Sequence, residues 1–407
     1  MKENLKPELV APSGDWSSLH SAVDSGADAV YFGVKGINMR YGATNFDVLE
    51  IKKVMDFLHE EGKKGYLALN VFIYNNEVEK IKKILEEAKK SEVDAVILWD
   101  MAVLSMAKEL GLKVHLSTQA SVSNFEALKF YSAQGVERVV LARECSLEDI
   151  KKIISQISEK SVPCGIETFI HGAMCVSISG RCFLSHDSFS KSANRGECIQ
   201  PCRREFTITD QDEECIYTLG EDYILSPKDL CTIKLIDQLI LAGINAFKIE
   251  GRMRSPEYVK VVTSAYRRAI DAFSDGELDN KLKEELLDEL ENSFNRGFSD
   301  GFYFEKADDL GGKLQHGYEK IYLGEVIKFY KKIGVAEVLI TNGSLAEGQQ
   351  ILVTGKKTPA NFTKVDQMQI DHKAVDSVAK GTAVGIKVPF DVRPKDKVFL
   401  WKEKEQL

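Results

Sequence analysis

The stretch "ELVAPSGDWSSLHSAVDSGADAVYFG" (residues 8–33) contains two short apolar runs, ELVAPSG and ADAVYFG, separated by a polar turn and a segment of helical spacing. The alternation continues with apolar runs at residues 64–70, 94–100, 113–119, 138–144, 165–172 and 246–251. Each run is short and mostly continuous, as expected for strands that are buried on both faces. Eight strands alternating with helices predict an α/β fold, a TIM-like (β/α)8 barrel over residues 1–278.

The segments between the runs have the spacing of amphipathic helices. After the run at residues 64–70, apolar side chains at positions 78, 81, 84, 85 and 88 fall on one stripe of a helix. Ser146 with Asp149, and Ser255 with Pro256, are helix-start signals. No glycine-rich turn of the dinucleotide-binding kind follows the first strand, so we favour the barrel over an open, doubly wound sheet.

The alternation is interrupted once, by residues 173–245 between the seventh and eighth strands. An insertion that follows a strand lies at the C-terminal face of a barrel, where such enzymes place their chemistry. Residues 279–319 are expected to form a helical connector. Residues 320–407 contain short runs separated by glycine and charged residues, which predicts a small C-terminal all-β barrel domain.

Four of the eight cysteines lie within 28 residues of this insertion, at the spacing C-x6-C-x15-C-x3-C. Four thiolates satisfy either zinc or an iron–sulfur cluster, and the wide first pair favours the cluster, because zinc sites usually pair their ligands more closely. The flanking Gly, Ser, Arg and Asn residues indicate an exposed loop and not a core that uses cysteine as a small apolar side chain. The predicted ligands are Cys175, Cys182, Cys198 and Cys202, with Cys215 and Cys231 as alternatives for the fourth.

The composition, 44% hydrophobic and 29% charged, is that of a globular protein, and no apolar run is long enough to span a bilayer. No signal region opens the sequence, so we expect a cytoplasmic protein with no membrane partner, in which disulfides are the poorest explanation of the cysteines. The net charge of −8 argues mildly against a nucleic-acid binder, although basic residues gather around the cysteines.

Polar side chains stand at the predicted strand ends, where packing does not explain them. Glu167 and His171 are spaced so that both are expected to face the barrel interior. His171 is either a structural histidine or an acid/base group and substrate ligand. Arg143 and Arg252 would suit a small molecule that bears a carboxylate. The candidate catalytic residues are therefore His171, Glu167, Arg143, Arg252 and Glu250. No H-E-x-x-H, G-x-S-x-G or G-x-x-x-x-G-K-[ST] motif occurs, so the residues alone do not name a reaction.

Taken in order, "ELVAPSG", "GADAVYFG", "HLSTQASVSN", "IHGAMCVSISGRCFLS", "NRGECIQPCR", "SPKDL" and "FKIEGRMRS" resemble the family called peptidase U32, or collagenase-like protease. The resemblance covers essentially the whole barrel, and the HGAMC…SGRC stretch is the signature of that family. Members with assigned roles are mostly oxygen-insertion proteins that carry a [4Fe–4S] cluster. Their branches hydroxylate tRNA wobble uridine at C5 with prephenate as oxygen source, hydroxylate a ribosomal RNA cytidine, or serve oxygen-independent ubiquinone synthesis.

This sequence looks most similar to the tRNA branch, because its cysteine motif ends as C-x3-C-R and a small β-domain follows. The resemblance implies that Cys175, Cys182 and Cys198 are cluster ligands with Cys202 as the fourth, while the ubiquinone branch keeps Cys231 open. It also implies that the barrel mouth holds prephenate and that a tRNA anticodon loop is the partner. The basic residues expected to meet RNA phosphates are Arg195, Arg203, Arg204 and Arg254. The C-terminal domain resembles the β-barrels of translation factors and is a candidate RNA-docking surface or a structural cap.

Two other functions stay open. A peptidase, as the family name says, needs a nucleophile or a metal-bound water, and a site closed by four thiolates leaves no position for that water. A metal site of fewer cysteines near His171 or His186 would restore this alternative. In the other case the cysteines hold structural zinc, and the protein is a noncatalytic RNA-binding accessory. The need for a partner subunit of the same family also stays open.

Overall fold

The computed structural model describes residues 6–178, 181–204, 206–209, 216–219, 227–304 and 318–403. Eight parallel strands form a closed barrel, because the last strand pairs with both the first and the seventh. The strands are β1 (Glu8–Pro12), β2 (Ala29–Gly33), β3 (Lys64–Ala68), β4 (Ala95–Leu98), β5 (Val114–Leu116), β6 (Val136–Val140), β7 (Gly165–Gly172) and β11 (Ala246–Ile249). The predicted TIM-like barrel is confirmed, and each strand lies within its predicted apolar run or begins at most two residues before it.

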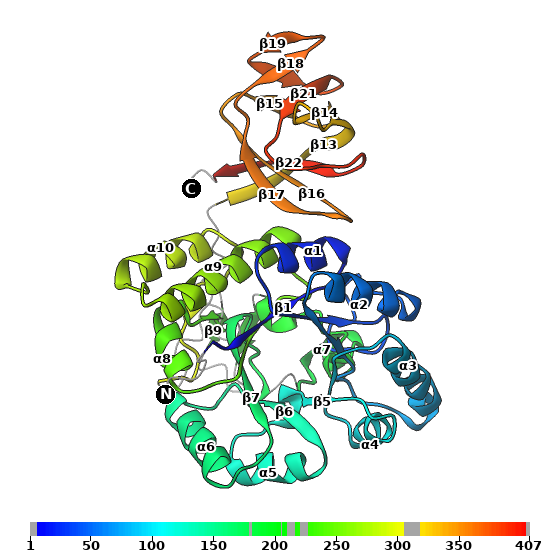
Figure 1. Ribbon diagram of the computed structural model, residues 1–407, viewed down its shortest axis with the longest axis vertical. Helices are drawn as coiled ribbons and strands as arrows, with labels where there is room; N and C mark the ends of the chain where they lie inside the picture. Colours follow the sequence, from blue (N-terminus) through cyan, green and yellow to red (C-terminus); the bar gives the residue numbers. More distant parts are fainter. Residues whose placement is uncertain are drawn as a thin grey trace.

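A ring of helices surrounds the barrel (Figure 1). They are α1 (Trp16–Asp24), α2 (Ile51–Glu60), α3 (Val78–Lys90), α4 (Met101–Glu109), α5 (Phe125–Ala133), α6 (Leu147–Glu159), α8 (Ile236–Leu241) and α9 (Pro256–Asp275), followed by α10 (Asn280–Glu291). The main core lies between these helices and the strands, where the stripe of α3 buries Ile81, Ile84, Leu85 and Ala88. A smaller core of alternate strand residues, including Val10, Tyr31, Tyr66 and Ile97, fills the barrel interior.

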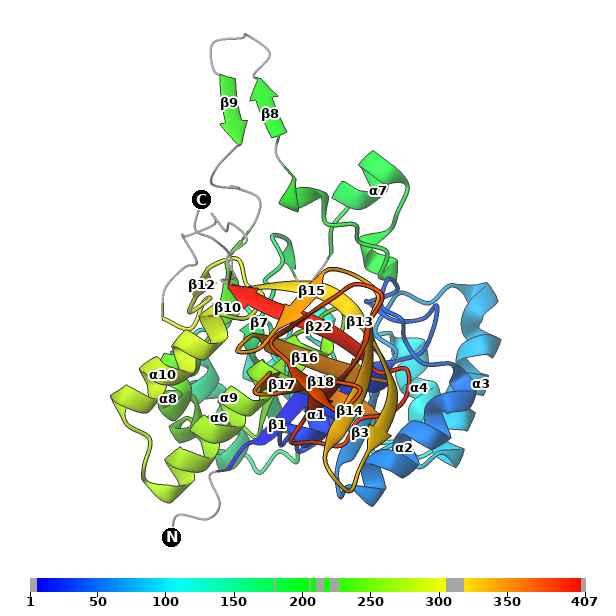
Figure 2. The same ribbon diagram turned by 90° about the horizontal axis from the view of Figure 1, so that it is seen from above.

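The segment between β7 and β11 contains two different parts. Its first part carries α7 (Leu184–Phe189) and the hairpin of β8 (Phe206–Thr209) and β9 (Ile216–Leu219), which stand out from the barrel (Figure 2). The chain returns through β10 (Asp229–Cys231), which pairs antiparallel with the end of β7 and parallel with β12 (Phe298–Ser299). The last part, with α8, is the ordinary helix of a β/α unit. The residues predicted as one insertion, 173–245, therefore include a regular barrel element at their C-terminal end.

Two glycines allow the insertion to approach the barrel closely. Gly172 ends β7 at a φ of +106°, and a Cβ atom there would lie 2.5 Å from the carbonyl oxygen of Glu250. Gly196 has a φ of +84°, and its Cβ would lie 2.1 Å from the carbonyl oxygen of Asn38. The Gly196 carbonyl accepts a hydrogen bond from the Tyr41 amide at 3.1 Å. The insertion is thereby held against the loop that follows β2.

The C-terminal residues form an antiparallel all-β domain, as predicted. One sheet contains β13 (Tyr318–Tyr330), β14 (Val335–Ile340), β16 (Gln350–Gly355), β17 (Thr358–Lys364), β18 (Met368–Ile370), β19 (Lys373–Val375), β21 (Ala383–Lys387) and β22 (Lys397–Glu403), and β15 (Ser344–Ala346) pairs with β20 (Ser377–Ala379). Among the described strands, β17 and β19 are the two ends of the sheet and do not pair with each other, so closure into a barrel is not seen.

The C-terminal domain packs on α1 and α9 of the barrel (Figure 1). The Ser17 hydroxyl donates to the Gly355 carbonyl at 2.6 Å, and the Ala360 amide donates to the Ser21 hydroxyl at 2.9 Å. The predicted connector, residues 279–319, contains α10, β12 and the first residues of β13. Among the described helices, none has the length and apolar character needed to cross a bilayer.

Truncation of the core leucine Leu67, which is fully buried on β3, is expected to cost about 2–5 kcal/mol of unfolding free energy, because a cavity remains between β3 and its covering helices. The matched control is Leu49→Ala, since Leu49 is 84% exposed and its truncation should change the free energy by about 0.5 kcal/mol or less. Urea unfolding followed by circular dichroism measures both. Equal losses in the two variants would contradict the described core.

Candidate functional site

A cavity opens at the C-terminal ends of the barrel strands, with an empty volume of about 430 Å³ measured out to its mouth. Its walls come from β2, β3, β4, β6, β7 and β11 and from the loops that follow them. The polar groups lining it are Arg40, Asn70, Ser117, Thr118, Gln119, Arg143, Lys248, Glu250 and Arg252. The structure therefore brings Arg143, Glu250 and Arg252, three of the five candidate catalytic residues, to one cavity.

The carboxylate of Glu250 is the acidic centre of this cavity. Arg40 donates to its Oε1 from Nε at 3.0 Å and from Nη2 at 2.7 Å, and Nη2 of Arg143 lies 3.9 Å from Oε2. Burial alone would raise the pKa of Glu250, but the charges of Arg40, Arg143 and Arg252 outweigh burial and lower it to about 2. Glu250 is therefore ionised at neutral pH and is a poor proton donor.

Arg252 is buried, with 4% of its surface exposed. Its Nη1 donates to the Asn38 side-chain oxygen at 3.1 Å, and among the described residues its Nε has no hydrogen-bond partner. Burial lowers the pKa of Arg252 to about 10, which leaves it charged at neutral pH. A buried N–H group without a partner is costly, and an anionic ligand in the cavity would supply the acceptor.

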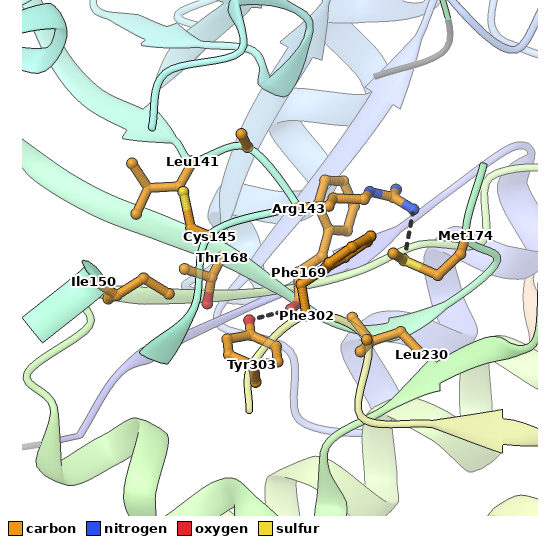
Figure 3. A pocket seen from close by; sticks show the side chains of 12 residues that line it. Leu141, Arg143, Cys145, Ile150, Thr168, Phe169, Met174, Leu230, Phe302 and Tyr303 are labelled. Carbon is orange, nitrogen blue, oxygen red and sulfur yellow. Dashed lines mark hydrogen bonds between the residues drawn. The ribbon is translucent and has the colours of Figure 1, made fainter. Parts of the chain in front are cut away.

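Arg143 is held from two sides at the rim. Its Nη1 donates to the Ala173 carbonyl at 2.6 Å, and its guanidinium lies 4.0 Å from the centre of the Phe169 ring. Figure 3 shows this side chain beside Phe169, pointing toward Met174. Below it, the Tyr303 hydroxyl donates to the Phe169 carbonyl at 2.6 Å. These contacts fix Arg143 against the start of the cysteine insertion.

Glu167 lies inside the barrel, as predicted, at the floor of the cavity. Its Oε1 is 2.5 Å from Nζ of Lys248, and its Oε2 is 3.3 Å from Nη1 of Arg138. Burial would raise the pKa of Glu167, but Lys248 and Arg138 hold it below its ordinary value. Burial lowers the pKa of Lys248 despite the attraction of Glu167. The two side chains form a buried pair, with Lys248 on the cavity side.

His171 does not face the barrel interior, and this expectation was wrong. Its ring packs among Tyr258 and Tyr266 of α9 and Phe298, at centroid distances of 5.4 to 6.0 Å. The pairing of β7 with β11 shifts register after Phe169, so the simple alternation of side chains fails there. Burial lowers the pKa of His171 to about 3. The residue is a neutral core histidine in this structure.

The four predicted ligand cysteines lie in one region above the cavity. Backbone N–H groups of Ser177, Leu184 and Gln200 each point at the sulfur two residues earlier, at 3.4 Å, for Cys175, Cys182 and Cys198. Burial raises the pKa of Cys202, and the charges of Cys198, Cys175 and Cys182 add to that shift. Cys175 also acts electrostatically on Arg40 and Arg143 of the cavity. The four thiols are thus close to one another and to the barrel mouth.

Four thiols of this kind could hold either a zinc ion or an iron–sulfur cluster. One zinc ion, about 2.3 Å from each thiolate, would hold the sulfurs within about 4 Å of one another. In the described part of the chain, no three His, Cys, Asp or Glu side chains are grouped in that way. A cluster of several irons holds its outer thiolates farther apart, and N–H groups directed at sulfur stabilise thiolate charge.

Cys231 belongs to a different environment. It is 5% exposed on β10, it accepts a hydrogen bond from the Tyr266 hydroxyl at 3.8 Å, and burial raises its pKa to about 12. These features are those of a packed, protonated thiol. Cys145 and Cys164 are likewise buried. Cys215 lies outside the described residues.

The four arginines expected to meet RNA are placed differently from one another. Arg195 pairs with Glu77 at the start of α3 and donates to the Phe72 carbonyl. Arg203 donates to the carbonyls of Pro227 and Met174. Arg254 lies 3.8 Å above the Phe294 ring. Arg204 is exposed and lies 4.6 Å from the Phe189 ring. Three of the four therefore brace the insertion or the rim, and Arg204 is the most accessible.

Two charged residues of the cavity were missed as site residues. Arg40 lies in the loop after β2, 210 positions before its partner Glu250, and no local pattern connects the two. Lys248 stands inside an apolar strand, where a buried lysine is itself an uncommon feature. The lysine is visible within the apolar run AFKIEG, and this unusual position could have identified it as a site residue.

Replacement of His171 by Phe is expected to reduce the fall in unfolding free energy that the protein shows as the pH is lowered. Unfolded His171 takes up a proton below its ordinary pKa of 6.5, whereas the folded residue stays neutral to about 3. The unfolded state thus binds more protons in this window, and stability is lost as the pH falls through it. Between pH 6.5 and 5 the variant should lose about 2 kcal/mol less than the parent, at about 1.4 kcal/mol per pH unit. Urea unfolding at both pH values measures this, and parallel losses would contradict it.

Comparison with curated proteins identifies full-length relatives. The chain is 39% identical to a collagenase of Porphyromonas gingivalis, over 98% of this chain and 99% of that one. It is 42% identical to an uncharacterized protease of Methanocaldococcus jannaschii, over 97% and 98% of the two chains. It is 39% identical to tRNA hydroxylation protein P1 of Bacillus subtilis, over 66% of this chain and 64% of that one.

Among solved structures, the U32 peptidase Mk0906 shares 14% identity and a TM-score of 0.41, over 63% of this chain and 97% of that one. The profile of peptidase family U32 matches residues 14–312, which include the barrel from α1 onward, without β1, and the cysteine insertion. On this match, and on full-length relatives at 39% and 42% identity, the chain belongs to peptidase family U32.

Proposed function

We propose that this protein is an iron–sulfur enzyme that hydroxylates the wobble uridine of tRNA at C5, with prephenate as the oxygen source. The observation that carries the proposal is the position of the four-cysteine group directly beside a cavity lined by cations. Cys175 interacts electrostatically with Arg40 and Arg143, and both arginines line the cavity. A metal centre and a small anionic cosubstrate would therefore be neighbours.

Relatives support the RNA-directed part of the proposal. They include the tRNA hydroxylation protein P1 of Bacillus subtilis and the 23S rRNA 5-hydroxycytidine C2501 synthase of Escherichia coli, which is 33% identical over 87% of this chain and 53% of that protein. The first name describes hydroxylation of a tRNA, and the second describes formation of a hydroxycytidine in ribosomal RNA. An unpaired base in an anticodon loop can leave its stack and enter a pocket, which suits a mouth at the end of a barrel.

Cys175, Cys182, Cys198 and Cys202 would hold a [4Fe–4S] cluster, which when bound supplies electron-transfer chemistry. Of the other residues, Arg252 and Arg143 would bind and orient the carboxylates of the small acid. Arg40 would keep Glu250 ionised and hold its carboxylate in place. The aromatic rings of Tyr31 and Phe169 would pack against the apolar part of the acid and exclude water.

Peptidase activity is the second candidate, and the names of the two full-length relatives favour it. Hydrolysis by a hydroxyl nucleophile needs a base beside it. None of the described residues that line the cavity is a histidine, and the hydroxyl of Thr118 donates to the Leu141 carbonyl at 3.1 Å. His171, the histidine of the signature stretch, lies near the end of β7, and its ring is buried against α9. The Ser117 hydroxyl, which also lines the cavity, donates to the Gln119 side-chain oxygen, so neither hydroxyl is paired with a histidine base in the described site.

Replacement of Cys175 or Cys182 by Ala is expected to abolish both cluster loading and wobble-uridine hydroxylation, because each removes a thiolate ligand. The matched control is Cys164→Ala, since Cys164 is buried away from the group and should affect only packing. Protein purified without oxygen is analysed for visible absorption, iron, zinc and sulfide, and tRNA from the same strains is analysed by mass spectrometry. Full tRNA modification in a strain that carries only Cys175→Ala would rule out the proposed site.

Replacement of Arg252 by Ala is expected to raise the prephenate concentration needed for half-maximal hydroxylation by about tenfold or more, which corresponds to the loss of a charged hydrogen bond of about 1.5–3 kcal/mol. Iron and sulfide content should stay unchanged, because Arg252 lies among barrel residues and not among the cysteines. Arg268→Ala, which removes an exposed pair with Glu289, is the control. An unaltered prephenate dependence of Arg252→Ala would count against the cavity as the acid site.

A further inference from the structure

The cavity floor holds a primary amine in an unusual setting. Lys248 is 4% exposed and lies on β11 with its side chain inside the barrel, where it lines the cavity with Tyr31 and Phe169. Its Nζ lies 4.4 Å from the centre of the Tyr31 ring and 5.9 Å from that of Phe169. The residue thus combines burial and aromatic neighbours with a position on the wall of the cavity.

Burial lowers the pKa of Lys248, although the neighbouring carboxylate of Glu167 acts to raise it. Arg138 and Arg252 both repel its positive charge, and burial acts in the same direction. Glu167 offers the acceptor, with Oε1 at 2.5 Å from Nζ. Burial and neighbouring cations are the features that activate a lysine amine as a nucleophile, and here they accompany a position on the cavity wall. A structural ion pair needs only the Glu167 contact and does not need a cavity in front of the amine.

The arginines define what the amine would meet. Arg252 has an N–H group without a partner among the described residues, and Arg40 and Arg143 stand at the rim of the same cavity. A ligand carboxylate bound by these groups would place the neighbouring carbon of the ligand over the cavity floor. The class of small acid whose neighbouring carbon reacts with an amine is the 2-oxo acid.

We propose that Lys248 forms an imine with the ketone of a 2-oxo acid bound in the barrel mouth. The inference rests on the small-acid site of the proposed function and adds a covalent step to it. The ammonium proton of Lys248 passes to Glu167, and the free amine adds to the carbonyl carbon to give a carbinolamine. Glu167 returns a proton to the hydroxyl, which leaves as water. The lysine ammonium and the ketone thus give a protonated imine and one water molecule, with no change of oxidation state.

The test is reductive trapping. The protein is purified without oxygen, incubated with pyruvate and sodium cyanoborohydride, and analysed by intact mass and peptide mapping. Pyruvate is expected to add once, on Lys248, as a reduced secondary amine. Lactate has the same carboxylate and no ketone, so it should give no adduct and should slow the labelling by pyruvate. Absence of an adduct on Lys248 in the parent protein would overturn the inference without any variant.

Variants separate the amine from its surroundings. Lys248→Arg keeps the positive charge and cannot form an imine, so labelling is expected to fall to the background of other lysines. Lys64→Arg is the matched control, because Lys64 is also paired with a carboxylate, Glu8 at 2.7 Å, at the opposite end of the barrel. Glu167→Gln keeps the amine and removes the proton acceptor, and should slow labelling at Lys248. Labelling that survives Lys248→Arg unchanged would overturn the inference.

The tRNA assay on the same proteins distinguishes this inference from the proposed function. If the protein hydroxylates tRNA in a prephenate-dependent way but forms no adduct, the imine is contradicted and the proposed function is supported. An adduct on Lys248 in a protein that leaves tRNA unmodified would support the imine and contradict the proposed function.

Discussion

The balance of buried charge inside the barrel is the constraint on which the rest of the site depends. Glu8, Arg138, Glu167 and Lys248 form a continuous series of ion pairs from the N-terminal end of the barrel to the cavity floor. A buried charge without a counter-charge costs several kcal/mol, so removal of one member leaves its neighbour exposed to that cost. The ion pairs form only if each of these strands keeps its register with its neighbours. The series of ion pairs therefore constrains both the strand register and the position of Lys248 at the cavity floor.

At the mouth the balance is different. Arg40, Arg143, Arg252 and Lys248 face one cavity whose lining holds a single carboxylate, Glu250. This excess of positive charge is what an anionic ligand would neutralise. The same field reaches Cys175, so that the thiolate region and the anion region influence each other electrostatically. The cysteine group and the cation-lined cavity of the proposed function therefore share one electrostatic environment. The C-terminal sheet contacts the barrel elsewhere, through α1 and α9.

Much of the fold could be predicted from the sequence. Buried parallel strands appear in it as short apolar runs, and the helices between them appear as apolar residues at helical spacing. The rim residues Arg143, Glu250 and Arg252 could be predicted because they stand just after strands β6 and β11, whereas the cysteine group is recognised from its spacing within one insertion. His171 could not, because a register shift between β7 and β11 reverses the side of the sheet on which it lies. The pairing of Arg40 with Glu250 could not either, because contacts between distant loops leave no local pattern.

The docking of the insertion at Gly196 has a consequence for how the site is assembled. Tyr41 and Arg40 belong to the same loop, so the segment that carries Cys198 is attached to one of the cations of the cavity wall. Arg195 adds a second attachment, to Glu77 at the edge of α3. The cysteine segment is thus attached to the loops around the cavity, although it contributes none of the described residues that line it. A displacement of the cysteine segment would therefore be transmitted through Tyr41 to Arg40, and through Arg195 to the start of α3.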